Sequence, residues 1–314
     1  MFGTAAILYV LFLRPVDGLD RFRTVARTPV AQLAMNAYGR SGAVRMHFAL
    51  PGESVDFPLE VHGDPNHMRY SWLPLRNGRA TEPQSLAGAL VAPREPGFYR
   101  LAVLSDSSLR VFDDLPLAVI VPFSEKSGNS LNGYRIGRYR GERRPFGSAT
   151  TPRGFVQVTA GDLDIRVTEH LRLADFVTHD TQSGWPRYVA LDPRILDKLE
   201  LVFGVLASAP SDSALSTGRV AVDVHSGFRT PLYNRRVSRS AGDSRHQYGD
   251  AADIAIDVDR NGRVNASDVR LLASAVELVE KEHPDLLGGL GVYTRNGAPY
   301  VHVDSRGIRV RWRG

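Results

Sequence analysis

The sequence predicts an α+β protein in which an antiparallel β-sandwich domain precedes a domain of mixed helices and strands. Two observations predict this division. Between residues 41 and 122, short alternating apolar segments are separated by turn sequences such as Pro51-Gly52 and Asn77-Gly78, which is typical of antiparallel β-structure. After residue 155, strand-like segments occur together with helical periodicity, notably from Pro193 onward. A chain of 314 residues is long enough for two domains with separate cores.

Residues 1–13 form a nearly continuous apolar segment that ends at Arg14-Pro15. The segment is shorter than the ~20 residues that cross a bilayer as a helix, and it lacks the positively charged region of a secretory signal. A buried first strand or helix is one interpretation. We favour the other, in which residues 1–40 comprise an export signal or membrane anchor followed by a connector.

Residues 41–122 contain the strands of the predicted sandwich. Alternating apolar side chains define four of them: Val44/Met46/Phe48, Met68/Tyr70/Trp72, Tyr99/Leu101/Val103 and Leu117/Val119/Val121. The turn at Pro96-Gly97 resembles that of an immunoglobulin-like domain, although the cysteine pair of such domains is absent. His62, Asp64 and His67 lie on a turn sequence, where we expect them to be solvated rather than to bind a metal. We expect this domain to act as a spacer or binding module.

Residues 123–154 are predicted to be a linker, since they are rich in Ser, Gly and Asn at first and then basic. The basic part contains one acidic residue, Glu142, and six arginines: Arg135, Arg138, Arg140, Arg143, Arg144 and Arg153. It is either a solvated linker or a contact for an anionic polymer or glycan. The net charge of +5 also favours polyanionic surroundings, but no motif typical of nucleic-acid binding is present. The absence of cysteine excludes disulfides and thiolate ligands.

A helix is predicted to begin at Pro193, because Asp192 is a good N-cap and proline is favoured at the first helical position. Its apolar residues recur at helical spacing and are assigned to the core: Ile195, Leu199, Val202 and Leu206. A strand over 219–225 then leads into Ser226-Gly-Phe-Arg229. Alternation directs His225 away from this motif, so it is predicted to be structural.

Three residues from two separate stretches have the chemistry of a metal site. His246 precedes Gly249 and Asp253 in a loop that leads into an apolar strand, and a buried strand is a costly place for an unpartnered carboxylate. In Tyr300-Val-His-Val-Asp304, alternation places Tyr300, His302 and Asp304 on one face. Two imidazoles and one carboxylate are typical of catalytic zinc, whose open position lowers the pKa of a bound water to about 7. We therefore predict that zinc binds to His246, Asp253 and His302.

The same residues resemble the zinc D-alanyl-D-alanine carboxypeptidase and endopeptidase family of bacterial cell-wall peptidases, whose fold is shared by the Hedgehog signalling domain. Ser244 to Asp253 reproduce the pattern S-x-H-x-x-G-x-A-x-D, and Ser226 to Asn234 resemble S-G-[YF]-R-[ST]-x-x-x-N. The ending from Val301-His-Val-Asp304 to Arg311-Trp312 is similar to that of the endopeptidase branch. The resemblance covers roughly residues 160–314 and implies that 155–314 form a zinc peptidase domain.

The resemblance implies hydrolysis of peptide bonds in peptidoglycan stems or cross-links, of the D,D-carboxypeptidase or endopeptidase type, in the periplasm or cell envelope. That location is the reason for favouring an export signal or anchor in residues 1–13. The resemblance gives Arg229 a catalytic and substrate-binding role, on a carboxylate or a developing oxyanion. Ser226 is grouped with the substrate-binding residues, and its main expected role is to fix the loop through hydrogen bonds to the backbone. Tyr293 and Tyr300 are candidate hydrogen-bond donors to the transition state.

The general base is less well defined, because relatives have a carboxylate or histidine two or three residues before the last zinc histidine. Here those positions are Pro299 and Tyr300. Asp304 is our first choice, either as the base or as a partner that orients a ligand.

The segment after Asp253 fits a twelve-position calcium loop. Its expected ligands are Asp257, Asp259, Asn261, Arg263 (through its backbone carbonyl), Asn265 and Asp268. The aspartate at the last position resembles the dockerin loop, and a helix is predicted to follow it, but a strand rather than a helix precedes it. We expect a structural calcium that fixes the strand of Asp253, and the other interpretation is a turn that binds no metal.

Two functions from other classes remain open. One is a catalytically inactive cell-wall-binding or scaffold protein with the same fold, which the missing upstream base favours. The other is calcium-dependent adhesion through the β-sandwich.

Overall fold

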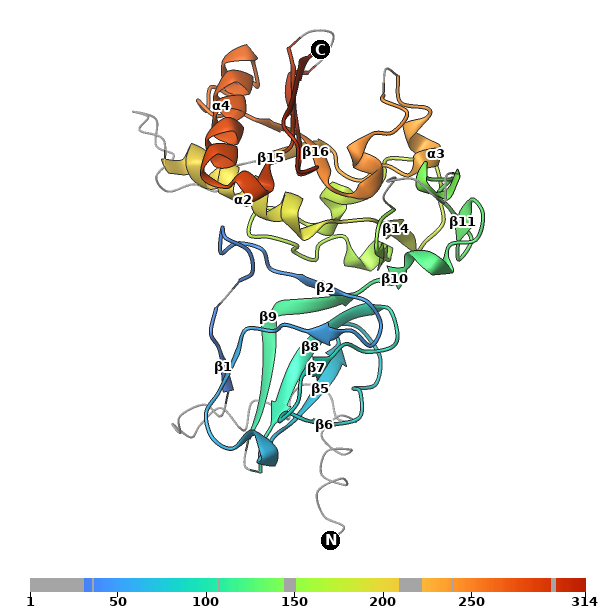
Figure 1. Cartoon of the computed structure of the whole chain (residues 1–314), viewed down its shortest axis with the longest axis vertical. Helices are drawn as coiled ribbons and strands as arrows, with labels where there is room; N and C mark the ends of the chain where they lie inside the picture. Colours follow the sequence, from blue (N-terminus) through green and yellow to red (C-terminus); the bar gives the residue numbers. More distant parts are fainter. Residues whose placement is uncertain are drawn as a thin grey trace. The chain divides into compact units, whose positions relative to one another are not determined.

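The computed structural model describes residues 31–35, 37–106, 108–143, 151–208, 222–238, 240–294 and 298–314. The chain forms two compact units, which we describe separately. The first contains Ala49–Val119 and residues 31–35, and the second contains Ala37–Phe48 and the described part of Ile120–Gly314. The prediction of an α+β protein is confirmed, since helices and several sheets occur together (Figure 1). The apolar segment 1–13 lies outside the described residues.

The first unit consists mainly of antiparallel strands. Four of them are neighbours in the order β9-β8-β5-β6, and β1-β4 and β3-β7 form two further pairs. The strands are β1 (Ala31–Leu33), β3 (Ser54–Val55), β4 (Leu59–Val61), β5 (Arg69–Pro74), β6 (Gln84–Ser85), β7 (Leu90–Val91), β8 (Gly97–Leu104) and β9 (Leu109–Val119). A 3-10 turn, η2, covers Pro65–His67, and β2 (His47–Ala49) lies where the chain passes between the units.

The core of the first unit is built around Trp72, which is fully buried and donates its indole N–H to the carbonyl of Val91 at 2.7 Å. The hydroxyl of Tyr99 donates to the carbonyl of Glu95 at 2.9 Å, four residues upstream across the Pro96-Gly97 turn. This contact ties the turn to the start of β8. Buried indole and phenol groups are stable here because their polar atoms have backbone partners.

The second unit begins with β10 (Val121–Pro122), β13 (Gly154–Val158) and β14 (Arg187–Val189), which pair antiparallel in that order. The stretch predicted as a linker belongs to this unit, and its described part contains the hairpin of β11 (Ser130–Leu131) and β12 (Tyr134–Arg135). Short 3-10 turns complete this region: η3 (Phe123–Glu125), η4 (Gly141–Arg143), η5 (Ala160–Asp162) and η6 (Leu173–Phe176).

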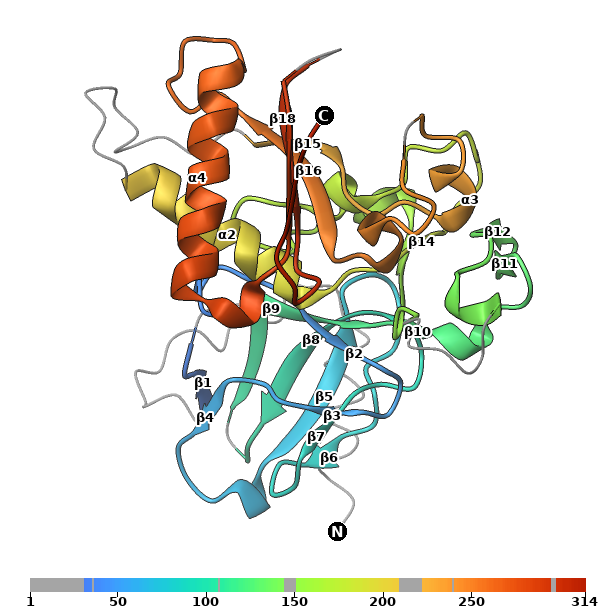
Figure 2. The same ribbon diagram turned by 45° about the horizontal axis from the view of Figure 1, so that its top comes forward.

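A five-stranded sheet in the second unit has the order β15-β16-β18-β17-β19. Its strands are β15 (Val222–Ser226), β16 (Ala251–Ile256), β17 (Gly289–Tyr293), β18 (Tyr300–Asp304) and β19 (Val310–Arg313). The remaining elements of the region are α2 (Pro193–Ser208), α3 (Pro231–Asn234), η8 (Arg245–Tyr248), α4 (Ala266–Glu282) and η9 (Pro284–Leu286). Figure 2 shows α4 alongside the strands of this sheet, and α2 packs against α4.

α2 begins at Pro193, as the sequence predicts, and α4 begins at Ala266, inside the stretch predicted as the calcium loop. Oδ1 of Asp192 accepts the backbone N–H of Arg194 at 2.9 Å, and Asn265 caps α4 by accepting from the backbone N–H of Ser267 at 2.7 Å. The apolar face of the sheet turns toward α4, because Leu290 and Val292 of β17 line a hollow together with residues of that helix. These two residues pair with Val303 and Val301 of β18. The opposite face of the sheet, which we call the site face, is therefore the face on which Tyr300, His302 and Asp304 of β18 lie.

Candidate metal centre

Three elements place His246, Asp253 and His302 together on the site face. His246 lies on η8, Asp253 on β16 and His302 on β18, and the last two are direct partners across the strands. η8 ends at Gly249 with φ +74°, and a Cβ there would overlap the backbone of Ala190. Only glycine fits that turn, which returns the chain from His246 into β16. The three residues are at most 6% exposed.

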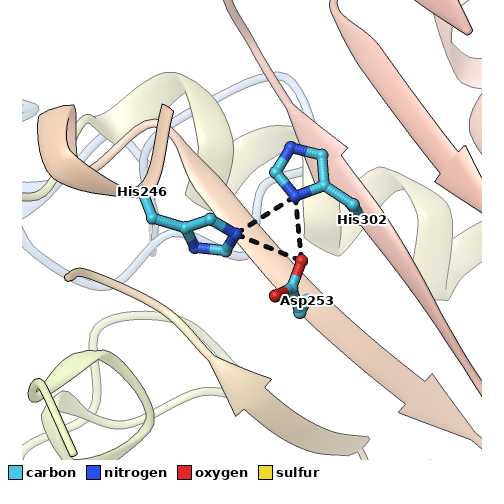
Figure 3. A group of neighbouring side chains, drawn as sticks. All are labelled: His246, Asp253 and His302. Carbon is cyan, nitrogen blue, oxygen red and sulfur yellow. Dashed lines mark hydrogen bonds and ion pairs between the residues drawn. The ribbon is translucent and has the colours of Figure 1, made fainter. Parts of the chain in front are cut away.

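The ligand atoms of the three side chains form a small triangle (Figure 3). Nε2 of His246 lies 3.1 Å from Oδ1 of Asp253, and Nδ1 of His302 lies 2.8 Å from the same oxygen. The two nitrogens are 3.1 Å apart. Ligand atoms around a tetrahedral zinc ion with bonds of ~2.0 Å are about 3.3 Å apart, so the triangle has the dimensions of a zinc site.

Hydrogen bonds on the far sides of the two rings fix which nitrogens face the triangle. Nδ1–H of His246 donates to the carbonyl of Gly227 at 2.6 Å, and Nε2–H of His302 donates to Oδ2 of Asp304 at 3.2 Å. In the neutral rings, the nitrogens inside the triangle therefore present lone pairs. A cation offsets the repulsion of two nitrogen lone pairs and a carboxylate oxygen at this separation, either as a metal ion between them or as a proton on His302. The donor set fits zinc.

The pKa directions follow from the same packing. Burial lowers the pKa of His246, which favours the neutral ring that a metal requires. Burial would also lower the pKa of His302, but its contacts with Asp253 and Asp304 outweigh burial and raise it. Burial opposes ionisation of Asp253, yet the two histidines outweigh it and hold the pKa of this carboxyl below its usual range. The carboxylates that favour a proton on His302 also favour a metal cation beside it.

Arg229 contacts the metal centre through Asp253. Its guanidinium pairs with Oδ2 of Asp253, and its Nε–H donates to the hydroxyl of Ser226 at 2.7 Å. The sequence predicts that Arg229 binds substrate, and the structure adds that it holds the outer oxygen of Asp253, a candidate metal ligand. A guanidinium has five N–H donors, so these two contacts leave further donors for a substrate oxygen.

Asp304 is fully buried behind His302. Besides the bond from His302, its carboxylate accepts the backbone N–H of Gly289 at 2.7 Å and pairs with Arg306. Burial opposes ionisation, but these contacts outweigh it and lower the pKa of Asp304. Asp304 was expected either to act as the general base or to orient a zinc ligand, and its contact with His302 fits the second role.

An aromatic group borders the centre on the site face. The rings of Tyr293 and Tyr300 stack with centroids 4.4 Å apart, and the indole N–H of Trp312 donates to the hydroxyl of Tyr293 at 2.8 Å. The ring of Trp312 also lies 5.1 Å from that of His302. Burial, followed by the charge of Asp253, raises the pKa of Tyr300 to about 12, so this phenol keeps its proton at neutral pH and can donate a hydrogen bond.

The expected calcium residues form a second group just beyond β16. Carboxylate oxygens of Asp257, Asp259 and Asp268 lie within 4.8 Å of one another. The buried Asp268 also accepts the backbone N–H of Val258 at 2.9 Å. Asn265 caps α4, Asn261 accepts the backbone N–H of Arg263 at 3.0 Å, and all of these contacts lie inside the loop.

The sequence analysis missed Lys198 and Glu280, which form a buried ion pair of 2.7 Å between α2 and α4. Lys198 also donates to the carbonyl of Asp304 at 2.6 Å. The sequence does indicate that Lys198 is buried. It is three residues after Ile195 and four before Val202, so it lies on the apolar face of the helix. His225, which the sequence predicts to be structural, lies on β15 with its Nε2 3.1 Å from Oδ2 of Asp223.

Comparison of the chain with protein-family models, curated proteins and solved structures found no match. No helix within the described ranges combines the length and the apolar character that crossing a membrane requires.

Proposed function

We propose that the second unit is a zinc metallopeptidase that hydrolyses peptide bonds in peptidoglycan stems or cross-links, with the fold of the zinc D-alanyl-D-alanine peptidases. One observation supports this most: the candidate ligand atoms of the three residues lie 2.8–3.1 Å from one another, and each residue is held from behind by a separate partner. Such support behind each ligand is typical of functional metal sites. Both carboxypeptidase and endopeptidase action fit this proposal.

When bound, zinc would supply Lewis-acid polarisation of the scissile carbonyl and a nucleophile at neutral pH. The chain supplies the arrangement. Arg229 holds Asp253 so that Oδ1 faces the histidines, and its further donors can bind a carbonyl or carboxylate oxygen of the substrate. Tyr300, protonated at neutral pH, can donate a hydrogen bond to an oxygen on which negative charge develops.

The first unit fits the proposal as an immunoglobulin-like spacer or wall-binding module. The buried Trp72 and the bond from Tyr99 to the carbonyl of Glu95 are features of immunoglobulin-like sandwiches, in which a tyrosine near a strand start bonds to upstream backbone. The protein would act in the periplasm or cell envelope, through an export signal or membrane anchor in residues 1–40, and its net charge of +5 suits anionic surroundings. Nucleic acid is not an expected partner.

A second candidate is a cell-wall-binding or scaffold protein that keeps the fold and the metal without catalysis. One feature of the sequence favours it. Pro299 and Tyr300 occupy the positions where the zinc peptidases that this chain resembles have an acid–base residue. The contacts that bury Asp304 also make it a poor base, so this candidate predicts metal binding without turnover.

Elemental mass spectrometry of the full chain tests the proposal, with wild type compared with His246→Ala and with His62→Ala, a control in the exposed part of the first unit. We expect about one zinc per chain in wild type and control, little in His246→Ala, and hydrolysis of muropeptides only where zinc is bound. Zinc without hydrolysis would favour the scaffold protein. Absence of zinc after reconstitution would exclude both.

A further inference from the structure

A β-bulge in β15 places His225 on the same side of the strand as Ser226, which is the site face. In the pairing with β16, Asp223 is opposite Ala255 and Val224 is opposite Ile254, but the partner of Asp253 is Ser226. His225 is therefore an extra residue in the strand. Regular alternation would direct it away from Ser226, and a bulge of this kind re-aims side chains.

Two contacts locate the imidazole of His225 on the site face. Its Nε2 lies 3.1 Å from Oδ2 of Asp223, whose partner Ala255 has the same orientation as Asp253 in β16. Its ring centroid lies 5.5 Å from that of Tyr300, which shares a face of β18 with His302. The side chain of His225 is 26% exposed, so solvent protons reach it.

Among the described residues, two side chains contact the ring of His225. Asp223 comes from its own strand and Tyr300 from β18. η6 also packs against β15 and contributes Asp175, which interacts electrostatically with Asp223. If Nε2–H donates to Asp223, Nδ1 has the free lone pair. A carboxylate that fixes the tautomer of a histidine is the usual arrangement for a base.

We propose that His225, oriented by Asp223, is the proton-transfer residue of the centre. This inference rests on the proposed peptidase function and supplies the base that is missing from positions 299 and 300. Nδ1 takes a proton from the attacking water as the bond between the water oxygen and the scissile carbonyl carbon forms. The proton then passes to the leaving nitrogen as the carbon–nitrogen bond breaks. Water and amide become a carboxylic acid and an amine, and the imidazole is neutral again.

The other candidates fit this role less well. Asp304 is fully buried, and its oxygens are engaged by His302, Gly289 and Arg306. Tyr300 is a phenol, which does not accept a proton near neutral pH. An imidazole both accepts and releases protons in this range.

The test compares His225→Ala and His225→Gln with wild type and with His179→Ala, an exposed histidine of the same unit, all in the full chain. We expect zinc content and KM to be unchanged in the His225 variants and kcat to fall by about 10²–10⁴-fold. The acidic limb of the pH–rate profile should disappear, and added imidazole should restore part of the activity to His225→Ala. His179→Ala should behave as wild type.

A second readout does not depend on activity. In Asp223→Asn the His225 ring should lose its fixed orientation, because its Nε2 lies 3.1 Å from Oδ2 of Asp223, and crystal structures of the variant and wild type measure this. An unchanged ring orientation in Asp223→Asn, or a kcat of the His225 variants within threefold of an active wild type, would overturn this inference and leave the proposed function intact. A wild type that binds zinc but hydrolyses no muropeptide would overturn both.

Discussion

The guanidinium of Arg229 pairs with Oδ2 of Asp253, the oxygen that does not face the two histidines. Oδ1 lies 2.8 Å from Nδ1 of His302 and 3.1 Å from Nε2 of His246. Asp253 is therefore held with one oxygen turned toward the two histidines. This arrangement links a motif arginine to metal affinity as well as to substrate binding.

We expect Arg229→Ala to weaken zinc binding by about 10–100-fold, the usual effect of removing a group that orients a ligand. Competition with a chromophoric chelator measures this affinity. Arg313→Ala is the control, because Arg313 is an exposed arginine on β19 of the same sheet. Equal zinc affinity in Arg229→Ala and wild type would mean that the arginine serves substrate alone.

The loop between β16 and α4 predicts a response to calcium. We propose that calcium binds to the carboxylates of Asp257, Asp259 and Asp268, which lie within 4.8 Å of one another. Calcium at about 100 times its Kd should stabilise the fold by about 2.7 kcal/mol and raise the Tm, because it binds only the folded loop. Asp257→Asn/Asp259→Asn should abolish the shift and leave α4 capped by Asn265.

The controls for calcium are magnesium, which demands octahedral geometry, and Asp106→Asn, an exposed aspartate of the first unit. A Tm that does not respond to calcium, or responds equally in the double variant, would leave the metal-free turn as the correct interpretation. If calcium fixes β16 as proposed, chelating it should also weaken zinc binding.

The buried ion pair of Lys198 and Glu280 predicts unequal costs for its two partners. Glu280 also pairs with Arg311 and accepts the backbone N–H of Gly288 at 3.0 Å. Burial is the main cause of the lowered pKa of Lys198, so its charge depends on these partners. Glu280→Gln leaves two cations without a counter-charge and should cost about 3–5 kcal/mol. Lys198→Met should cost less, since Arg311 still balances the carboxylate.

Urea unfolding followed by circular dichroism measures these costs, and Lys281→Met is the control for an exposed lysine of α4. The control should change the free energy of unfolding by no more than about 0.5 kcal/mol. The double variant should cost less than the sum of the single variants. Additive costs would mean that the pair contributes no coupling energy.

Local patterns predicted several features that lie within one element. Alternation in Tyr300–Asp304 is a property of a single strand, so it could be read from the sequence. The start of α2 was equally predictable from its cap, Asp192, whereas Asn265, the cap of α4, was predicted as a calcium ligand. The convergence of His246, Asp253 and His302 was predicted from residue chemistry and from a family resemblance, and the structure brings the three side chains together.

Features that depend on distant partners were not predictable in this way. The bulge at His225 exists only in the register between β15 and β16, and alternation counted back from Ser226 places His225 on the opposite face. Lys198 and Glu280 are 82 positions apart, so their pairing needs the packing of two helices. The pairing of Arg229 with Asp253 likewise depends on how the loop after β15 meets β16.

Tyr139 predicts loss of stability at alkaline pH. The residue is fully buried against Phe123 and Phe155, and no described residue hydrogen-bonds its hydroxyl. Burial raises its pKa well above the ordinary value of about 10. As the pH rises above about 10, the unfolded chain releases this proton and the folded chain retains it, so the free energy of unfolding falls.

Tyr139→Phe should remove this contribution. At about pH 7 its free energy of unfolding should stay within about 1 kcal/mol of wild type, since the ring is retained and the lost hydroxyl has no partner among the described residues. At about pH 11 the variant should be the more stable protein, with urea unfolding as the measurement. Burial also raises the pKa of Tyr134 and of Tyr248, so part of the alkaline loss should persist. Tyr233→Phe is the control for a half-buried tyrosine. If wild type and Tyr139→Phe lose the same free energy of unfolding between about pH 7 and pH 11, ionisation of Tyr139 does not destabilise the folded protein.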